Sequence, residues 1–240
     1  PPGGMINQVA KYPKDENETL IRAAVGSDNL FELGVDTTGQ LTDNARYRVV
    51  ALGRKQDGFQ DTTENERYTI APSVTIDLSK ATELTLSAYY QDDPQMVPST
   101  PLPGVGTLYE APYGKLDASV YAGDENWNSY SREVLMLGYK LNHEFNDNWS
   151  VLQKFRYTDA DALQQNTYHS GTPTDDIYLT RSAYLTDEEI DGVTVDTQVA
   201  GFVQTGDLAH NLLFGVDYQN SDSTVAYRDT LTTDTPVLDL

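Results

Sequence analysis

Hydrophobic and polar side chains alternate with a period of two along most of this chain. Between Asn211 and Tyr218 every second residue is apolar, namely Leu212, Phe214, Val216 and Tyr218. Successive side chains of a β-strand point to opposite faces of a sheet, so this pattern predicts strands with one apolar and one wet face. Nine such segments occur: Thr19–Val25, Leu30–Gln40, Ala45–Lys55, Arg67–Asp77, Glu83–Gln91, Ser131–Glu144, Trp149–Thr158, Gly192–Gln204 and His210–Ser221. We therefore expect an all-β protein.

The connections between these segments alternate in length. The short ones are Leu41–Asn44, Leu78–Thr82, Phe145–Asn148 and Thr205–Ala209, and Gly26–Asn29 is short where a long one is expected. The long polar ones are Gln56–Glu66, Gln91–Tyr130 and Asp159–Asp191. Outer-membrane β-barrels gather short turns at the periplasmic end and long loops at the extracellular end, whereas a soluble sandwich has no such need. The pattern predicts part of an antiparallel transmembrane β-barrel.

Aromatic residues near the predicted strand ends agree with a barrel. They are Tyr89, Tyr90, Trp149, Tyr157 and Tyr218. Amphipathic rings prefer the level of the lipid headgroups, so these residues are expected to form an interfacial girdle, although Tyr and Trp are also good strand formers in any sheet.

Composition excludes several classes of function. The chain has 16 Lys and Arg against 37 Asp and Glu, a formal net charge of -21. A polyanionic nucleic acid or an anionic lipid surface is therefore a poor partner. Cys is absent, so no disulfide or thiolate metal site can form. The acidic surplus either attracts cations to a vestibule or keeps exposed loops solvated, and charge runs generally mark solvated surface.

Short motifs occur along nearly the whole chain in an order that is similar to a known family. They are Pro2-Gly-Gly-Met-Ile-Asn-Gln-Val-Ala-Lys11, Ser27-Asp-Asn-Leu-Phe31, Glu66-Arg-Tyr-Thr-Ile-Ala-Pro72, Tyr130-Ser-Arg132, His143-Glu-Phe-Asn-Asp147, Thr205-Gly-Asp207 and Leu213-Phe-Gly-Val-Asp217. The set resembles TonB-dependent siderophore receptors, and it is most similar to those of the ferrichrome (ferric hydroxamate) type. The first motif matches the last plug strand of that family.

The resemblance implies a domain division and an incomplete barrel. Residues 1–13 would be the end of the plug domain, and residues 14–240 would be about the first nine strands of a plugged barrel of about 22. Nine strands leave two open edges, and unpaired backbone groups are not tolerated in lipid. We therefore expect the chain to be a fragment that cannot transport alone.

The resemblance also implies the function. A ferric siderophore, expected to be a hydroxamate, would bind outside and be imported with energy from the TonB complex, which contacts the plug N-terminus. The expected location is the outer membrane of a Gram-negative bacterium, with lipid and lipopolysaccharide as neighbours. Because the siderophore already coordinates the iron, no resident cofactor, no metal ligand and no catalysis are implied. Two alternatives stay open: the same fold importing another chelate such as cobalamin, or a secreted soluble β-sheet binding module.

Aromatic residues in the long connections are the candidate siderophore-binding residues, because receptors of this family hold the ligand mainly with aromatic and polar side chains. Tyr168 falls near a family aromatic position and is the first candidate. The others are Trp127, Tyr109, Tyr113 and Tyr121. Each could instead pack against its own loop. The segment Gln95–Pro103 departs from ferrichrome receptors, which carry pocket aromatics there, and this concerns the cargo rather than the class.

The sequence gives no sign of a protein-bound metal. His143, His169 and His210 are widely separated. The acidic stretch Asp187–Gly192 has part of the spacing of an EF-hand loop, but the twelfth position is Gln198 and no helices flank it. We expect this stretch to be a solvated loop.

Overall fold

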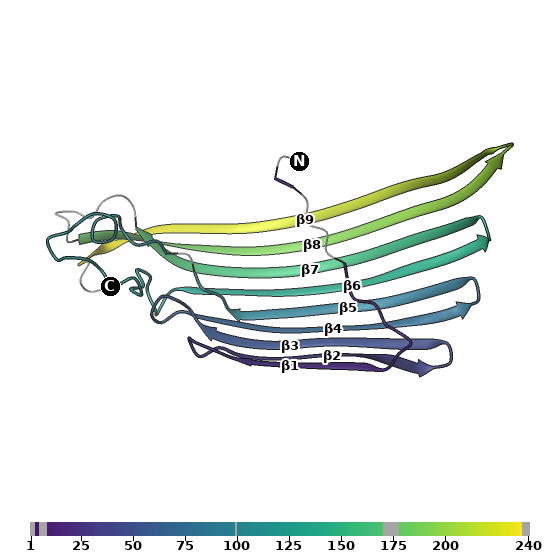
Figure 1. The fold of residues 1–240 in the computed structure, drawn as a ribbon. Helices are drawn as coiled ribbons and strands as arrows, with labels where there is room; N and C mark the ends of the chain where they lie inside the picture. Colours follow the sequence, from purple (N-terminus) through teal and green to yellow (C-terminus); the bar gives the residue numbers. More distant parts are fainter. Residues whose placement is uncertain (1–2, 5–8, 99, 170–177, 237–240) are drawn as a thin grey trace.

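The described residues form a single antiparallel β-sheet of nine strands in chain order, β1 to β9 (Figure 1). In the computed structural model the described residues are 3–4, 9–98, 100–169 and 178–236. The strands are β1 (Glu18–Val25), β2 (Phe31–Thr42), β3 (Ala45–Asp57), β4 (Glu64–Ser79), β5 (Thr82–Gln95), β6 (Ser129–Asn146), β7 (Trp149–His169), β8 (Tyr178–Thr205) and β9 (Leu208–Pro236). The predicted all-β fold and its nine strands are confirmed. Among the described residues, no helix has the length and apolarity to cross a membrane.

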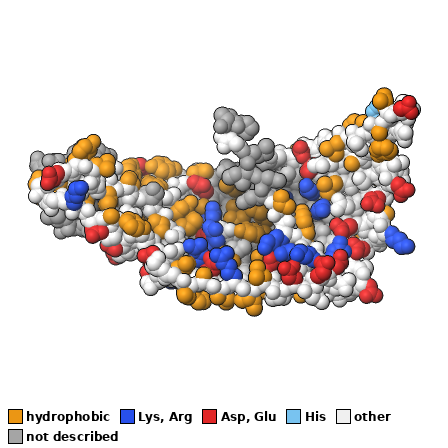
Figure 2. Space-filling view, in the orientation of Figure 1, with side chains coloured by type: hydrophobic (Ala, Val, Ile, Leu, Met, Phe, Trp, Pro, Cys, Tyr) orange, Lys and Arg blue, Asp and Glu red, His pale blue; other side chains and the backbone are white. Residues whose placement is uncertain are grey.

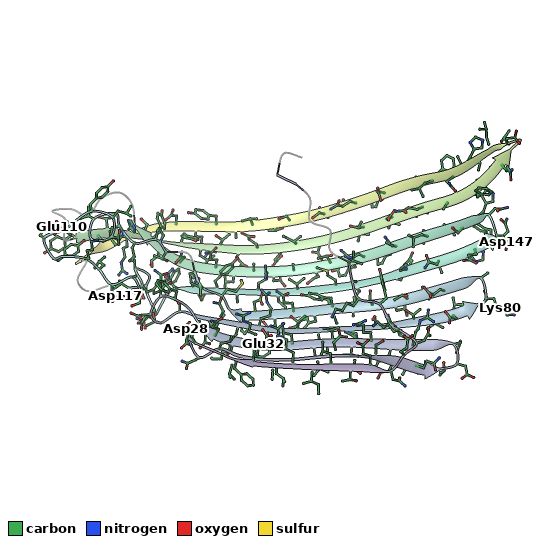
Figure 3. All side chains as sticks on the ribbon, in the orientation of Figure 1. Asp28, Glu32, Lys80, Glu110, Asp117 and Asp147 are labelled. Atoms are coloured by element: carbon green, nitrogen blue, oxygen red, sulfur yellow. The ribbon has the colours of Figure 1, made fainter. Side chains whose placement is uncertain are left out.

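The two ends of the sheet differ in their connections. At one end the turns are residues 43–44, 80–81, 147–148 and 206–207, each two residues long. At the other end lie residues 26–30, 58–63 and the long loop 96–128. Figure 3 labels Lys80 and Asp147 at the turn end, and Glu110 and Asp117 at the loop end. The predicted gathering of long connections at one end is confirmed for the described loops.

The predicted bounds differ from the structure by at most two residues at the turn end, and the large errors lie at the loop end. β7 runs to His169 rather than ending at Thr158, and β8 begins at Tyr178 rather than Gly192. The predicted loop Asp159–Asp191 is therefore mostly strand, and its remainder, residues 170–177, lies outside the described residues. The acidic stretch Asp187–Gly192 lies in β8 rather than in a loop. β9 continues past Ser221 to Pro236.

Residues 9–17, which precede β1, cross one face of the sheet (Figure 1), which we call the inner face. Lys11 pairs with Asp36 at 2.7 Å, and the carbonyl of Tyr12 accepts a hydrogen bond from Arg48. The Tyr12 ring lies 4.7 Å from the ammonium of Lys140, on β6. These contacts assign the even-numbered residues of β2 and β3 to the inner face, and the strand register extends the assignment to β9. These contacts do not test the predicted domain boundary after residue 13, which stays a prediction.

The inner face is polar and carries charges of both signs, as Figure 2 shows over the middle of the sheet. Arg48 donates two hydrogen bonds to the carboxylate of Asp36, at 2.8 and 2.7 Å. Asp93 is completely buried between Arg67 and Arg132. Opposite charges that pair in this way stabilise a polar interior, because each buried carboxylate keeps its hydrogen bonds.

The outer face is apolar although it is exposed. The large hydrophobic side chains on it include Ile21, Phe31, Leu33, Ile70, Leu86, Leu137, Phe214 and Val216, each at least 44% exposed. Soluble monomers rarely expose apolar surface that runs across a whole sheet. This distribution, wet inside and apolar outside, is that of a barrel wall that faces lipid.

The apolar band of the outer face ends at a definite level on β7, β8 and β9. On β7 the outer-face residues are apolar or aromatic near Phe155 and Tyr157, and the next one is Asp159. On β9 the band ends at Tyr218 and is followed by Asn220 and Asp222. Tyr157 and Tyr218 therefore lie where the predicted girdle requires. The prediction is wrong for Tyr89, which faces inward and donates a hydrogen bond to Gln91.

Candidate functional site

Three tyrosine rings and one carboxylate lie together on the inner face, near the loop end of β7, β8 and β9. The ring of Tyr184 contacts both other rings, at centroid distances of 5.8 Å to Tyr168 and 6.1 Å to Tyr227. The hydroxyls of Tyr168 and Tyr227 both donate to Oδ2 of Asp229, each at 2.9 Å. We call these four residues the tyrosine cluster. Its partly exposed rings and polar atoms suit an organic ligand with both apolar and polar groups.

The strand register brings the tyrosine cluster together. Tyr184 on β8 lies opposite Asn166 on β7 and opposite Asp229 on β9. Tyr168 follows Asn166 by two residues and Tyr227 precedes Asp229 by two, so all these side chains share a face. Residues far apart in the sequence thereby form one surface on rigid strands.

A chain of hydrogen bonds links the tyrosine cluster to the long loop 96–128. The Nδ2 atom of Asn128 donates to the hydroxyl of Tyr121 and to Oδ1 of Asn166, both at 2.5 Å. Asn166 in turn donates to the hydroxyl of Tyr184 at 3.3 Å. Thr100, near the start of the loop, also donates to Asn166, at 2.8 Å. These hydrogen bonds hold the loop against β7 beside the tyrosine cluster. A displacement of the loop would therefore also displace the side chains of the cluster.

The structure does not bring all five predicted aromatics together. Tyr168 belongs to the tyrosine cluster and Tyr121 is connected to it, but Tyr121 is only 8% exposed. Tyr113 donates to the carbonyl of Val105 and packs within its own loop. Tyr109 and Trp127 are exposed in the same loop. Contact of any of these residues with a ligand stays a prediction.

Sequence reasoning missed Tyr184, Tyr227 and Asp229. Tyr184 fell in the predicted loop Asp159–Asp191, and the other two lay beyond the last predicted strand. No alternation marks this part of β8, because Tyr184, Thr186, Glu188 and Ile190 share one face and include both apolar and polar residues. Neither face is consistently apolar there, so the alternation that marks a lipid-facing strand disappears.

Two hollows lie under the loops. One, of about 710 Å³, is lined by Gln60 and by residues of the loop 96–128, including Thr100 and Leu116. The other, of about 320 Å³, is lined by Asp61, Asp124, Glu125 and Arg181, among others.

Hydrogen bonds from the backbone and side chain of Ser119 hold the pKa of the Asp117 carboxyl below its ordinary value, so this loop keeps its negative charge. The described part of the chain contains no group of three or more His, Cys, Asp or Glu residues that could hold a metal ion.

Comparisons with known proteins agree with this architecture. Residues 67–239 match the family "TonB dependent receptor-like, beta-barrel". The chain is 34% identical over 237 residues to the ferrichrome outer membrane transporter/phage receptor of Escherichia coli K12, covering 90% of this chain and 32% of that protein. It is 31% identical over 229 residues to the ferrioxamine B receptor of Salmonella typhimurium, covering 94% of this chain and 32% of that protein.

Solved structures show the same fold. The closed form of the ferric-catecholate import receptor Fiu of Escherichia coli K12 superposes with a TM-score of 0.80 at 23% identity, over 92% of this chain and 34% of that one. A Pseudomonas aeruginosa FpvA–pyoverdine–iron complex gives a TM-score of 0.76 at 21% identity, over 91% and 29%. The chain spans about a third of the length of the curated relatives that it matches. By its fold and by the match over residues 67–239, the chain belongs to the TonB-dependent receptor β-barrel family and forms part of the barrel wall.

Proposed function

We propose that this chain is part of an outer-membrane receptor of a Gram-negative bacterium that binds a ferric siderophore and imports it with energy from the TonB complex. The observation that carries the proposal is the tyrosine cluster, an aromatic and polar surface on the inner face at the loop end. A ligand that arrives from the loop side of the barrel meets this surface before it can move further inward. Catalysis is no part of the proposal.

The proposed cargo is a ferric hydroxamate. Support comes from two relatives that are receptors for ferrichrome and ferrioxamine B, both hydroxamates. Further support comes from the partly exposed rings of the tyrosine cluster and from the carboxylate of Asp229, since hydroxamate complexes combine apolar spacers with polar groups. Lipid and lipopolysaccharide would cover the apolar outer face.

The test is growth under iron limitation. Cells that lack their other siderophore receptors, and that express the complete receptor containing this chain, are supplied with a panel of purified ferric siderophores. Rescue by a hydroxamate supports the proposal and identifies the cargo. If only a cobalt corrinoid or a ferric catecholate restores growth, the receptor imports that compound and the assignment of a hydroxamate is wrong. If no compound restores growth, the proposal of siderophore import is wrong.

Removing one ring of the tyrosine cluster should weaken uptake. The substitution Tyr184→Leu is expected to lower binding of the rescuing siderophore about tenfold, because it removes the ring that contacts both neighbours as well as the hydrogen bond from Asn166. Uptake of the iron-55 complex is the measurement. The matched control is Tyr218→Leu, which removes a ring from the outer face of β9. Equal losses in the two variants would mean that the tyrosine cluster does not contact the ligand.

A further inference from the structure

The loop-end part of the inner face on β7, β8 and β9 is polar, and the charges on its described residues are all negative. Among the described inner-face residues beyond the level of Thr158, the charged side chains are Glu188 and Asp229. The nearby cations Arg181, paired with His169 of β7, and Arg228, paired with Leu185 of β8, fall on the outer-face positions of their strands. Arg181 donates to the carbonyls of Ala122 and Gly123 in the loop. This contrasts with the middle of the inner face, where several cations occur.

The tyrosine cluster holds the side chain of Asp229 in a fixed position. Two phenol hydroxyls donate hydrogen bonds to the same oxygen, Oδ2. They also leave Oδ1 available to a ligand, since no described residue donates to it. The three rings beside it, those of Tyr168, Tyr184 and Tyr227, are partly exposed. Their faces carry the negative side of the aromatic quadrupole.

A carboxylate surrounded by tyrosine faces is the chemistry that recognises an ammonium group. The carboxylate supplies the negative charge and accepts hydrogen bonds from N–H groups. The ring faces add cation–π attraction and exclude water from the bound ammonium. A neutral ligand gains nothing from the charge of Asp229. An anionic complex, such as a ferric tris-catecholate, is repelled by both acids of this surface.

The charge of the ligand follows from its chemistry. Three hydroxamates bind iron(III) as three monoanions, so the chelate itself is neutral. Only an additional group can give it a positive charge, and a protonated primary amine is the simplest one. We infer that the tyrosine cluster selects ferric hydroxamates that carry such an amine over neutral and anionic ferric siderophores. This inference rests on the proposed function, which it extends from a chelate class to a charge.

The test compares two ligands that differ only in the amine. The probes are ferrioxamine B, which has a free terminal amine, and its N-acetyl derivative, with equilibrium binding measured on the purified complete receptor in detergent. Acetylation is expected to weaken binding about tenfold, because it removes both the ion pair and the cation–π contact. The difference should shrink as salt is raised, since partly exposed charges are screened.

Variants assign the effect to Asp229. In Asp229→Asn the preference for the amine should disappear, so that the two ligands bind with about equal affinity. Thermal unfolding of the variant in detergent checks that it is folded. Tyr227→Phe keeps the ring and removes one hydrogen bond to Asp229, so it should retain most of the preference. The control Asp222→Asn removes the same charge from the outer face of β9 and should retain all of it.

The outcomes separate the two proposals. If wild-type receptor binds both ligands with equal affinity, siderophore binding stands and charge selection is wrong. If the preference for the amine persists in Asp229→Asn, the assignment to the tyrosine cluster is wrong. If neither ligand binds and no hydroxamate in the growth panel is used, the proposed function fails and the inference fails with it.

Discussion

Replacing Leu86 with arginine is expected to destabilise the receptor in the membrane by about 2–4 kcal/mol, the cost of a basic side chain on the lipid face near the bilayer midplane. Leu86 lies on the outer face of β5, between Val74 of β4 and Tyr139 of β6, and is 44% exposed in the absence of lipid. In lipid its side chain contacts acyl chains, where a guanidinium has neither water nor a partner. Urea unfolding of the receptor in vesicles measures the loss.

The matched control for Leu86→Arg is Ser87→Arg, one residue along the same strand. Ser87 points to the inner face, so the new guanidinium enters a polar surface that already holds cations paired with carboxylates. This variant should lose less than about 1 kcal/mol. If both variants are destabilised equally, or if Ser87→Arg is the worse of the two, the assignment of the outer face to lipid is wrong.

The sequence predicts the strands best where lipid would impose a pattern on them. Between Trp149 and Tyr157 four of the five outer-face residues are apolar or aromatic, the exception being Gln153, and the prediction for β7 begins at the correct residue. Beyond Tyr157 both faces are polar, and the alternation no longer distinguishes a strand from a loop. The continuation of β7 to His169 follows instead from pairing with β8, which is a long-range property.

The tyrosine cluster shows the same limit at the level of the site. Tyr168 was identified through the family resemblance, and its neighbours were not. Asp229 lies 61 residues after Tyr168, and the two meet only because the register sets Tyr184 opposite both Asn166 and Asp229. A shift of one residue in that register would turn Asp229 to the outer face. Composition and local pattern contain no information on this register, so the carboxylate could not be predicted.

The buried carboxylate of Asp93 should be the most sensitive charged group of the inner face. It accepts hydrogen bonds from Arg67 at 2.6 and 3.2 Å, from Arg132 at 3.1 and 2.7 Å, and from Gln91 at 2.6 Å. Asp93→Asn leaves the two guanidiniums beside each other with no anion between them. We expect a loss of about 3 kcal/mol, near the lower limit for a broken buried ion pair, because the side chains of Arg67 and Arg132 remain 44% and 38% exposed. Thermal unfolding of the complete receptor in detergent is the measurement.

The control for Asp93→Asn is Asp92→Asn, which removes the same charge from the neighbouring residue. Asp92 faces outward on β5, where it makes no ion pair with any described residue, and its loss should change stability by less than about 0.5 kcal/mol. A combined Arg67→Met and Asp93→Leu variant removes one cation together with the anion and should recover part of the loss, because a well-packed apolar pair avoids the desolvation of charge. If Asp93→Asn were as stable as Asp92→Asn, the two arginines would have to be held apart by contacts other than the carboxylate. The ion pairs of Asp93 with Arg67 and Arg132 would then not be what stabilises the packing of β4, β5 and β6 beneath the loops.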